Sequence, residues 1–206
     1  MVAFSFFGIS VYWYGIFYAL TFLISYGILS FLIKRKVFSF LPEFQSLLEA
    51  HLETIFMFLL LGVLLGGRLG DIFIYNFSYY LAHPSQMIAF WKGGMSFIGG
   101  IIGVILSLII FFWKYGRSWK LFFLLLDILL PFVALGIGLG RIGNFLNQEL
   151  YGILVPSGFR GMGYVLFSIL HDLQIFHVYS HVDTFLRVNT NLLASIFEGF
   201  LLMVCL

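Results

Sequence analysis

The stretch GRIGNFLNQELYG, Gly140 to Gly152, places an arginine, two asparagines and a glutamate at the end of a long apolar run. Arg141 has no acidic residue at helical spacing before it, and Glu149 follows only after the expected end of the helix. A guanidinium presents a planar fork of donors that matches a phosphate. An unpaired arginine at this place therefore predicts a bound anion, of which a lipid headgroup is the most available. Snorkelling of Arg141 to the interface is the alternative, but it does not account for Asn144 and Asn147 beside it.

A second arginine lies inside an apolar segment. Arg68 comes three positions before Asp71, so the two side chains can pair on one face of a helix. An ionisable side chain costs at least about 2.5 kcal/mol at the centre of a bilayer, so such groups are usually paired or functional. Both a structural and a functional role stay open for Arg68.

The composition identifies the class of protein that must position these residues. Hydrophobic residues make up 62% of the 206 residues and charged residues only 10%, whereas a soluble domain is about a quarter charged. The chain is therefore an integral membrane protein. The net charge of +2 gives no indication of a nucleic-acid partner, and no cluster of ligand residues indicates a metal.

Apolar segments long enough to approach the ~20 residues of a membrane span occur five times. They cover approximately residues 11–33, 54–75, 96–113, 121–139 and 191–206. The sequence predicts an all-α, polytopic bundle of about five transmembrane helices, forming a single domain over residues 1–206.

Two basic clusters set the expected orientation. Lys34, Arg35 and Lys36 follow the first segment, and Lys114, Arg117 and Lys120 lie between the third and the fourth. Both clusters fall on the same side of an up-and-down topology, which the positive-inside rule makes cytoplasmic. The amino terminus and the polar residues after the fourth segment are then expected outside, so the candidate site faces the outer side.

Glycines recur at a spacing of four within the apolar segments. They are Gly62, Gly66 and Gly70, Gly99 and Gly103, and Gly136 and Gly140. Small residues at this spacing allow helices to approach closely, and packing is the expected role for most of them. Residues 138–143 also match G-x-G-x-x-G, but a dinucleotide fingerprint requires a preceding strand, and a membrane helix is expected here.

Several blocks together resemble the prolipoprotein diacylglyceryl transferase family. GRIGNFLNQELYG is similar to the family signature over its whole length, and WYG (residues 13–15), GGRLG (66–70) and WKGGMSFIGGIIG (91–103) resemble further family blocks in the same order. RVNTNLLASIFEG, Arg187 to Gly199, resembles the family block R-H-P-S-Q-L-Y-E-A-x-x-E-G. The resemblance covers essentially the whole chain.

The resemblance implies a reaction in the bacterial inner membrane. The family moves the diacylglyceryl group of phosphatidylglycerol onto the lipobox cysteine of a prelipoprotein signal peptide, and glycerol phosphate leaves. By resemblance, Arg141 with Gly140 beside it, and Arg68, bind phosphatidylglycerol. The chemistry requires a thiolate nucleophile and donors that stabilise the leaving phosphate.

The same resemblance implies three catalytic residues and no cofactor. Asn144 and Glu149 match positions of the signature and are expected to shape the site. Tyr14 matches a functionally important family tyrosine, although an aromatic residue beside Trp13 is also typical of the membrane interface.

The chain departs from the family pattern at informative positions. The family block G-G-x-S-F-H-G-G has a histidine thought to assist proton transfer, where this chain has Ile98. A general base typically contributes 10²–10⁴-fold, so we expect activity to be weak or absent. The family tyrosine after GGRLG is Asp71 here, and the sequence ends before the family's last helix with its motif Y-G-x-x-R-x-x-x-E.

Three hypotheses follow. The first is a diacylglyceryl transferase. The second is a truncated, inactive relative of that enzyme, which Ile98 and the absent motif favour. The third is a small lipid or solute transporter, although nothing in the sequence resembles the repeats or paired broken helices of transporters.

Overall fold

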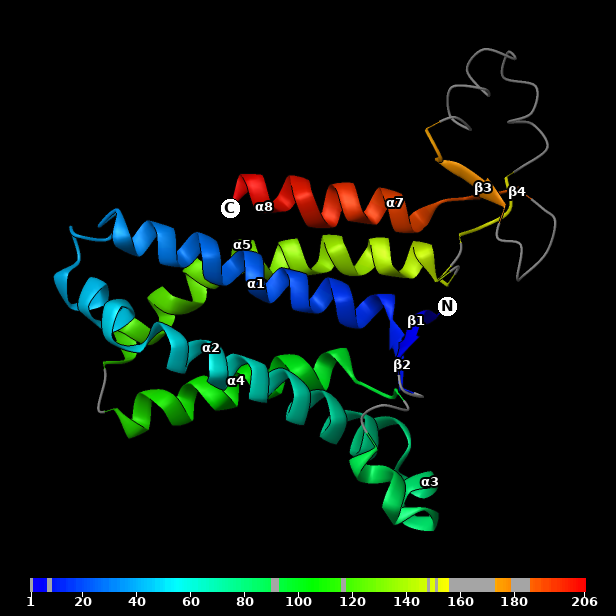
Figure 1. Cartoon of the computed structure of the whole chain (residues 1–206), viewed down its shortest axis with the longest axis horizontal. Helices are drawn as coiled ribbons and strands as arrows, with labels where there is room; N and C mark the ends of the chain where they lie inside the picture. The colour runs from blue at the N-terminus through cyan, green and yellow to red at the C-terminus, as the bar shows by residue number, and fades with distance from the viewer. Residues whose placement is uncertain are drawn as a thin grey trace. The chain divides into compact units, whose positions relative to one another are not determined.

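The structure is a computed structural model that describes residues 2–6, 9–89, 93–115, 118–147, 149–150, 152–155, 173–178 and 186–206. It is predominantly α-helical (Figure 1). The α-helices are α1 (Trp13–Lys34), α2 (Pro42–Gly70), α3 (Phe77–Ala82), α4 (Phe97–Lys114), α5 (Trp119–Leu146), α7 (Thr190–Ala194) and α8 (Leu202–Cys205). The strands are β1 (Val2–Phe6), β2 (Ile9–Tyr12), β3 (Phe176–Val178) and β4 (Leu186–Val188).

Among the described residues, four helices are long and apolar enough to cross a membrane. They are Gly15–Lys34, Pro42–Tyr75, Phe97–Lys114 and Trp119–Leu146. The fifth predicted segment is a shorter apolar helix, Thr190–Cys205, in which a π-helical segment (Ser195–Leu201) joins α7 to α8. The chain is thus the all-α, polytopic membrane protein that the composition predicted.

The chain divides into two compact units, each with its own packing. Unit 1 comprises Met1–Ile24 and Ile128–Leu206, and unit 2 comprises Ser25–Asp127. The helices α1 and α5 each contribute residues to both units.

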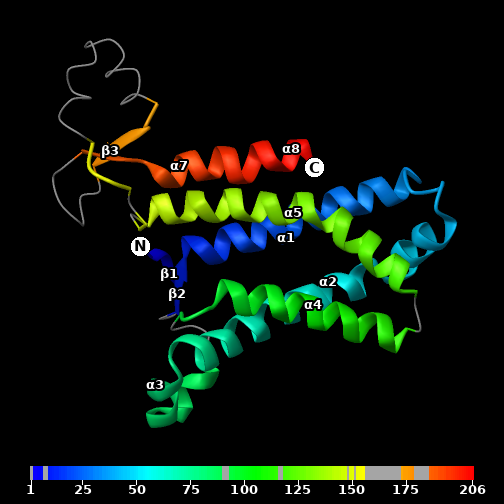
Figure 2. The same cartoon turned by 180° about the vertical axis from the view of Figure 1, so that it is seen from behind.

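Unit 2 is built on the contact between α2 and α4, which lie side by side (Figures 1 and 2). A Cβ atom on Gly66 would lie 2.6 Å from the Cα of Gly103, and one on Gly70 would lie 2.6 Å from the Cα of Gly99. Both distances are shorter than real Cβ contacts, so only glycine allows the two backbones to approach this closely. The spacing-of-four prediction is confirmed for these glycines.

The ends of α2 and α4 follow from local sequence. α2 begins with Pro42 in its first turn, where a missing N–H costs nothing, and Glu43 follows in the same turn. It therefore starts twelve residues before the predicted residue 54, because residues 42–53 are helix-compatible and add three fully buried apolar side chains, Phe44, Leu47 and Leu48. Ser96 caps α4 by accepting a hydrogen bond from the N–H of Gly99 at 3.0 Å.

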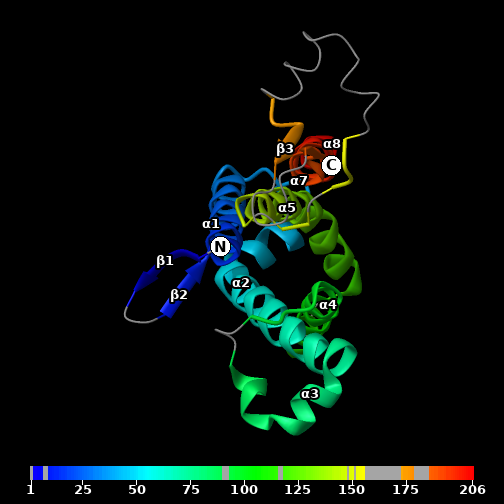
Figure 3. The ribbon, with the colours of Figure 1, turned by 90° about the vertical axis from the view of Figure 1, so that its right-hand side faces the viewer.

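Unit 1 contains α5, the helix Thr190–Cys205 and two short antiparallel hairpins. Figure 2 shows α7 and α8 running along α5, and a Cβ on Gly138 of α5 would lie 3.1 Å from the Cα of Gly199. β1 pairs with β2 just before α1 (Figure 3), and β3 pairs with β4 in the register His177 to Arg187. Neither hairpin was predicted, since each strand is only three to five residues long.

Candidate functional site

The signature stretch begins inside α5 and closes it, as the sequence predicted for the end of the fourth helix. The prediction ended the fourth segment at residue 139, where the apolar run ends, but α5 continues to Leu146 and includes Arg141 and Asn144. This boundary was wrong because main-chain hydrogen bonding continues through polar residues. Asn144 and Asn147 are buried, with 7% and 5% of their surface exposed. The polar side chains therefore belong to the packed end of α5.

A tight turn closes α5. The N–H of Asn147 donates to the carbonyl of Gly143 at 2.9 Å, and that of Glu149 donates to the carbonyl of Asn144 at 2.9 Å. The second bond spans six residues, and Leu150, which follows, has a positive φ of 50°. The turn leaves the side chain of Glu149 exposed just beyond the helix.

Side chains of the late block hold this turn in place. The amide of Asn191 donates to the carbonyl of Glu149 at 2.6 Å, and the hydroxyl of Thr190 donates to the carbonyl of Leu150 at 3.1 Å. Arg187 donates to the carbonyl of Gly152 at 3.1 Å. Two blocks that are distant in the sequence, the signature and RVNTNLLASIFEG, therefore meet within unit 1.

Arg141 and Glu198 form an ion pair between α5 and the late helix. The Nη2 atom of Arg141 lies 3.6 Å from the Oε2 atom of Glu198, and the two side chains are 35% and 59% exposed. Both line a pocket of about 330 Å³ whose remaining wall consists of Thr190, Leu193, Ala194 and Phe197. The pocket has one charged rim and an otherwise largely apolar lining, which suits an anionic group carried on an apolar chain.

The expectation of an unpaired Arg141 was therefore wrong. The acidic partner comes from a separate helix, and helical spacing along α5 gives no signal for such a pairing. The structure also places Tyr18 of α1 beside the signature, because a Cβ on Gly140 would lie 3.9 Å from the Tyr18 hydroxyl. Sequence reasoning selected Tyr14, one turn earlier. Tyr14 lies in the first turn of α1, and its side chain lies outside the described part of the structure.

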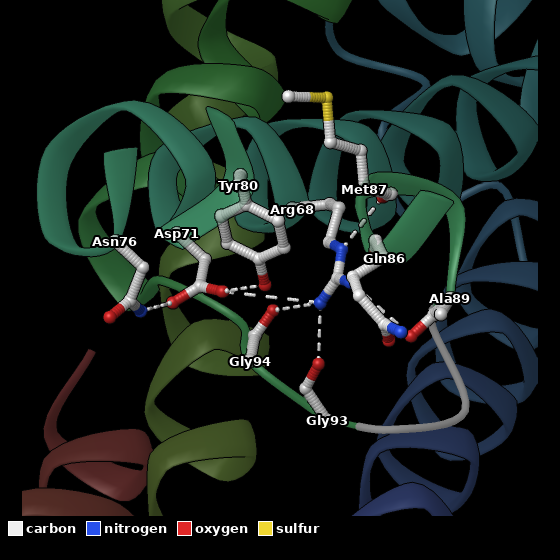
Figure 4. Close-up of polar contacts among 9 residues, drawn as sticks. All are labelled: Arg68, Asp71, Asn76, Tyr80, Gln86, Met87, Ala89, Gly93 and Gly94. Atoms are coloured by element: carbon white, nitrogen blue, oxygen red, sulfur yellow. Dashed lines mark hydrogen bonds and ion pairs between the residues drawn. The ribbon is translucent and has the colours of Figure 1, made fainter. Parts of the chain in front are cut away.

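Arg68 lies in unit 2 at the centre of a buried network (Figure 4). Only 3% of its surface is exposed. Its Nε, Nη1 and Nη2 atoms make five hydrogen bonds to main-chain carbonyls. The acceptors are Gln86, Met87 (2.9 Å), Ala89 (3.3 Å), Gly93 (2.5 Å) and Gly94 (2.9 Å). Because a guanidinium has five N–H donors, the loop that precedes α4 occupies all of them.

Asp71 supplies the counter-charge, as the three-residue spacing predicted. Its Oδ2 atom lies 3.9 Å from Nη1 of Arg68 and accepts a hydrogen bond from the Tyr80 hydroxyl at 2.7 Å. Asn76 donates to the other carboxylate oxygen at 2.9 Å. The hydrogen bond to Asp71, together with burial, raises the pKa of Tyr80 above its ordinary value. The phenol thus stays protonated and keeps donating to the carboxylate.

This network fixes the entrance to α4. Gly93 and Gly94 have positive φ values of 83° and 78°, and a Cβ on Gly94 would lie 2.5 Å from Oδ2 of Asp71. The N–H of Ser96 donates to the carbonyl of Gly67 at 2.8 Å, so the cap of α4 is tied to α2. Ile98 follows in the first turn of α4 and is 52% exposed. Binding of a lipid phosphate by Arg68 stays a prediction, and it would require the side chain to release some of these carbonyls.

The predicted site residues fall into two groups, one in each unit. Gly140, Arg141, Asn144 and Glu149 lie at one end of α5 within unit 1, whereas Arg68 belongs to the network of unit 2. Within the described residues, no group of three or more His, Cys, Asp or Glu side chains is placed to hold a metal ion.

Fold and site define a class first: an integral membrane protein with several spanning helices and an arginine-lined pocket at a helix end. Comparison with known proteins then identifies the family. A model of the family described as prolipoprotein diacylglyceryl transferase matches residues 1–206. The chain belongs to this family.

Individual relatives agree. The chain is 42% identical over 144 residues to a phosphatidylglycerol--prolipoprotein diacylglyceryl transferase of Bordetella avium, covering 70% of this chain and 51% of that protein. It is 35% identical over all 206 residues to a protein of the same name from Aromatoleum aromaticum, of which it covers 69%. A Geobacter sulfurreducens protein of that name is 43% identical over 149 residues, which are 71% of this chain and 53% of that protein. The matched stretch is thus about half the length of most of these relatives.

Proposed function

We propose that this protein transfers the diacylglyceryl group of phosphatidylglycerol to the lipobox cysteine thiol of prelipoproteins. The thiolate sulfur forms a bond to the terminal glyceryl carbon, the bond from that carbon to the phosphate oxygen breaks, and glycerol phosphate leaves with the electron pair. Family membership over residues 1–206 and the names of the relatives support this proposal.

The pocket beside Arg141 is the observation that carries the proposal. Its volume of about 330 Å³ is within the usual range of ligand sites. In this proposal Arg141 binds the phosphate of the lipid and stabilises the charge that develops on it as it leaves. Gly140 precedes Arg141 in the chain and is the other α5 residue assigned to lipid binding, and the apolar side chains of Leu193 and Phe197 contact the start of the acyl chains.

Other residues have supporting roles in this proposal. Asn144 is buried near the end of α5, about one helical turn after Arg141, and in this proposal it shapes the site there. Glu149 and Tyr14 are the candidate groups for contact with the reacting thiol or the headgroup hydroxyls. We assign Arg68 the positioning of the loop before α4, on the strength of its five carbonyl partners. Ile98 cannot accept a proton, so the thiol must lose its proton without help from that position.

We also propose that the protein lies in the bacterial inner membrane with the Arg141 pocket at the outer side. Lys34 ends α1 and Lys114 ends α4, which fits the basic clusters at the cytoplasmic ends of these helices. Arg117 of the second cluster lies outside the described residues. Phosphatidylglycerol and the signal peptide would both reach the pocket from the membrane.

Titration of short-chain phosphatidylglycerol into the protein in a neutral detergent, followed by calorimetry, tests the proposal. Arg141→Ala should weaken binding about tenfold or more, since a hydrogen bond to a charged group contributes about 1.5–3 kcal/mol. Arg141→Lys should be intermediate, because a point charge replaces a planar fork. Arg35→Ala is the matched control at an exposed position and should bind as the unmodified protein does. Equal affinity of Arg141→Ala and the control would reject the site.

A further inference from the structure

Glu198 lies where a second anion would compete with a lipid phosphate. Its carboxylate is the acidic group paired with Arg141, and both side chains line the same pocket of about 330 Å³. A phosphate bound to Arg141 would be negatively charged, as the Glu198 carboxylate is, and both anions would then lie beside the same guanidinium. The two cannot both remain close to it without mutual repulsion.

The ion pair is loose enough to be exchanged. Its N–O distance of 3.6 Å exceeds the 2.7–2.9 Å of a charge-assisted hydrogen bond, so the pair is electrostatic and no hydrogen bond forms between these atoms. The carboxylate is 59% exposed and the guanidinium 35% exposed. Because both side chains are partly exposed at the pocket, a better anion can reach the guanidinium and displace the carboxylate.

The backbone that carries Glu198 is nevertheless fixed. Gly199, the next residue, packs against Gly138 of α5, where a Cβ on Gly138 would meet the Cα of Gly199 at 3.1 Å. Gly138 lies three positions before Arg141 on α5, so this close contact lies next to the ion pair. Glu198 itself belongs to the π-helical segment Ser195–Leu201, a form of turn that is frequent at functional sites. The carboxylate can therefore leave Arg141 by rotation of its side chain while the two helices keep their contact.

We propose that Glu198 is a resident counter-anion that pairs with Arg141 in the empty site and yields it to the phosphate of an anionic lipid. The inference rests on the proposed function, since it takes Arg141 as the phosphate ligand. Glu198 therefore lowers the affinity for every anion that cannot displace it, because a phosphate must replace the carboxylate at the guanidinium before it can bind. A zwitterionic or neutral ligand does not displace the carboxylate, and the site stays closed to it.

The test is a double-mutant cycle on Arg141→Ala and Glu198→Gln, read by calorimetric titration with short-chain phosphatidylglycerol. Removal of the competing charge should make Glu198→Gln bind about twofold to fivefold more tightly than the unmodified protein, the range that corresponds to an exposed ion pair. In the Arg141→Ala background, Glu198→Gln should not change the affinity, because the guanidinium for which the carboxylate and the phosphate compete is absent. Glu53→Gln is an equal charge change at an exposed position of α2. It should leave the affinity for phosphatidylglycerol unchanged both in the unmodified protein and in the Arg141→Ala variant.

Three results separate the possible failures. If Arg141→Ala binds as the unmodified protein does, the proposed site itself is rejected, and this inference with it. If Arg141→Ala binds weakly but Glu198→Gln binds no more tightly than the unmodified protein, the site stands and Glu198 orients Arg141 instead of competing for it. If Glu198→Gln tightens binding equally in the Arg141→Ala background, the effect is one of overall charge and the inference is overturned. Short-chain phosphatidylcholine and free glycerol phosphate, titrated in parallel, distinguish recognition of an anionic lipid from recognition of phosphate alone.

Discussion

Replacement of Arg68 by methionine is expected to open the loop before α4. Methionine keeps an unbranched apolar stem but has no N–H donor, so five carbonyls lose their hydrogen bonds at once. Asp71 would keep the hydroxyl of Tyr80 and the amide of Asn76 but would lose its buried counter-charge.

The expected magnitude follows from burial. A hydrogen bond to a charged group contributes about 1.5–3 kcal/mol, but five such values do not add, because an opened loop returns its carbonyls to water. Removal of one partner of a buried charged pair costs about 3–5 kcal/mol, and with Arg68 3% exposed we expect a loss of this order. Arg68→Lys keeps three donors and the charge, and it should lose less.

Thermal unfolding in detergent measures the loss of stability, and limited proteolysis followed by mass spectrometry locates it. Arg68→Met should unfold at a lower temperature and be cleaved within residues 83–94. Arg35→Met, at an exposed position, should change the free energy of unfolding by less than about 0.5 kcal/mol. If Arg68→Met unfolds and is cleaved as the Arg35→Met control is, the assignment of Arg68 as the residue that holds this loop is refuted.

Three further predictions concern packing, pH and orientation. Gly66→Ala should destabilise the protein by about 1–3 kcal/mol in thermal unfolding, because its Cβ would meet backbone atoms of α4, whereas Gly27→Ala, with nothing within 4 Å, should be neutral or slightly stabilising. Since the pKa of Tyr80 is raised above its ordinary value of about 10, its hydrogen bond to Asp71 stabilises the fold fully below pH 10 and is lost as the pH rises through the raised pKa. Unfolding measured between pH 8 and pH 12 should show this loss, and Tyr80→Phe should be less stable at pH 8 and lose less stability over that range. The orientation can be tested with single cysteines in a chain whose Cys205 has been replaced by serine. In intact cells, a cysteine at Ser39 should be shielded from a membrane-impermeant thiol reagent, and a cysteine at Ile153 should be labelled. The reverse pattern would contradict the orientation.

Much of the fold could be predicted because its signals are local. Continuous apolar runs identified the membrane helices. The spacing of Gly66 and Gly70 and of Gly99 and Gly103 predicted close helix packing, although the sequence did not say that α2 and α4 are the two helices that pack. The pairing of Arg68 with Asp71 also followed from their spacing on one helix.

The parts that could not be predicted depend on contacts between distant segments. The partner of Arg141 is Glu198, on another helix, and no periodicity along α5 points to it. The acceptors of Arg68 are main-chain carbonyls, which every residue has, so the sequence carries no mark of the network. The sequence pointed to Tyr14 because the family block contains it. Tyr18 was not selected, because only the packing of α1 on α5 shows that its hydroxyl lies beside Gly140.

The most direct test of the central claim is the transfer reaction itself. The purified protein is incubated with phosphatidylglycerol and a peptide that contains a lipobox cysteine, and the thioether product is quantified by mass spectrometry between pH 6 and pH 8.5. Without a base at Ile98, the rate should follow the fraction of thiolate and rise about tenfold per pH unit below the thiol pKa of about 8.5. We expect slow formation of the diacylglyceryl thioether with this pH slope, loss of the product with Arg141→Ala, and no product from a cysteine-to-serine peptide. Absence of the thioether at every pH, from protein shown to bind phosphatidylglycerol, would contradict the proposed reaction.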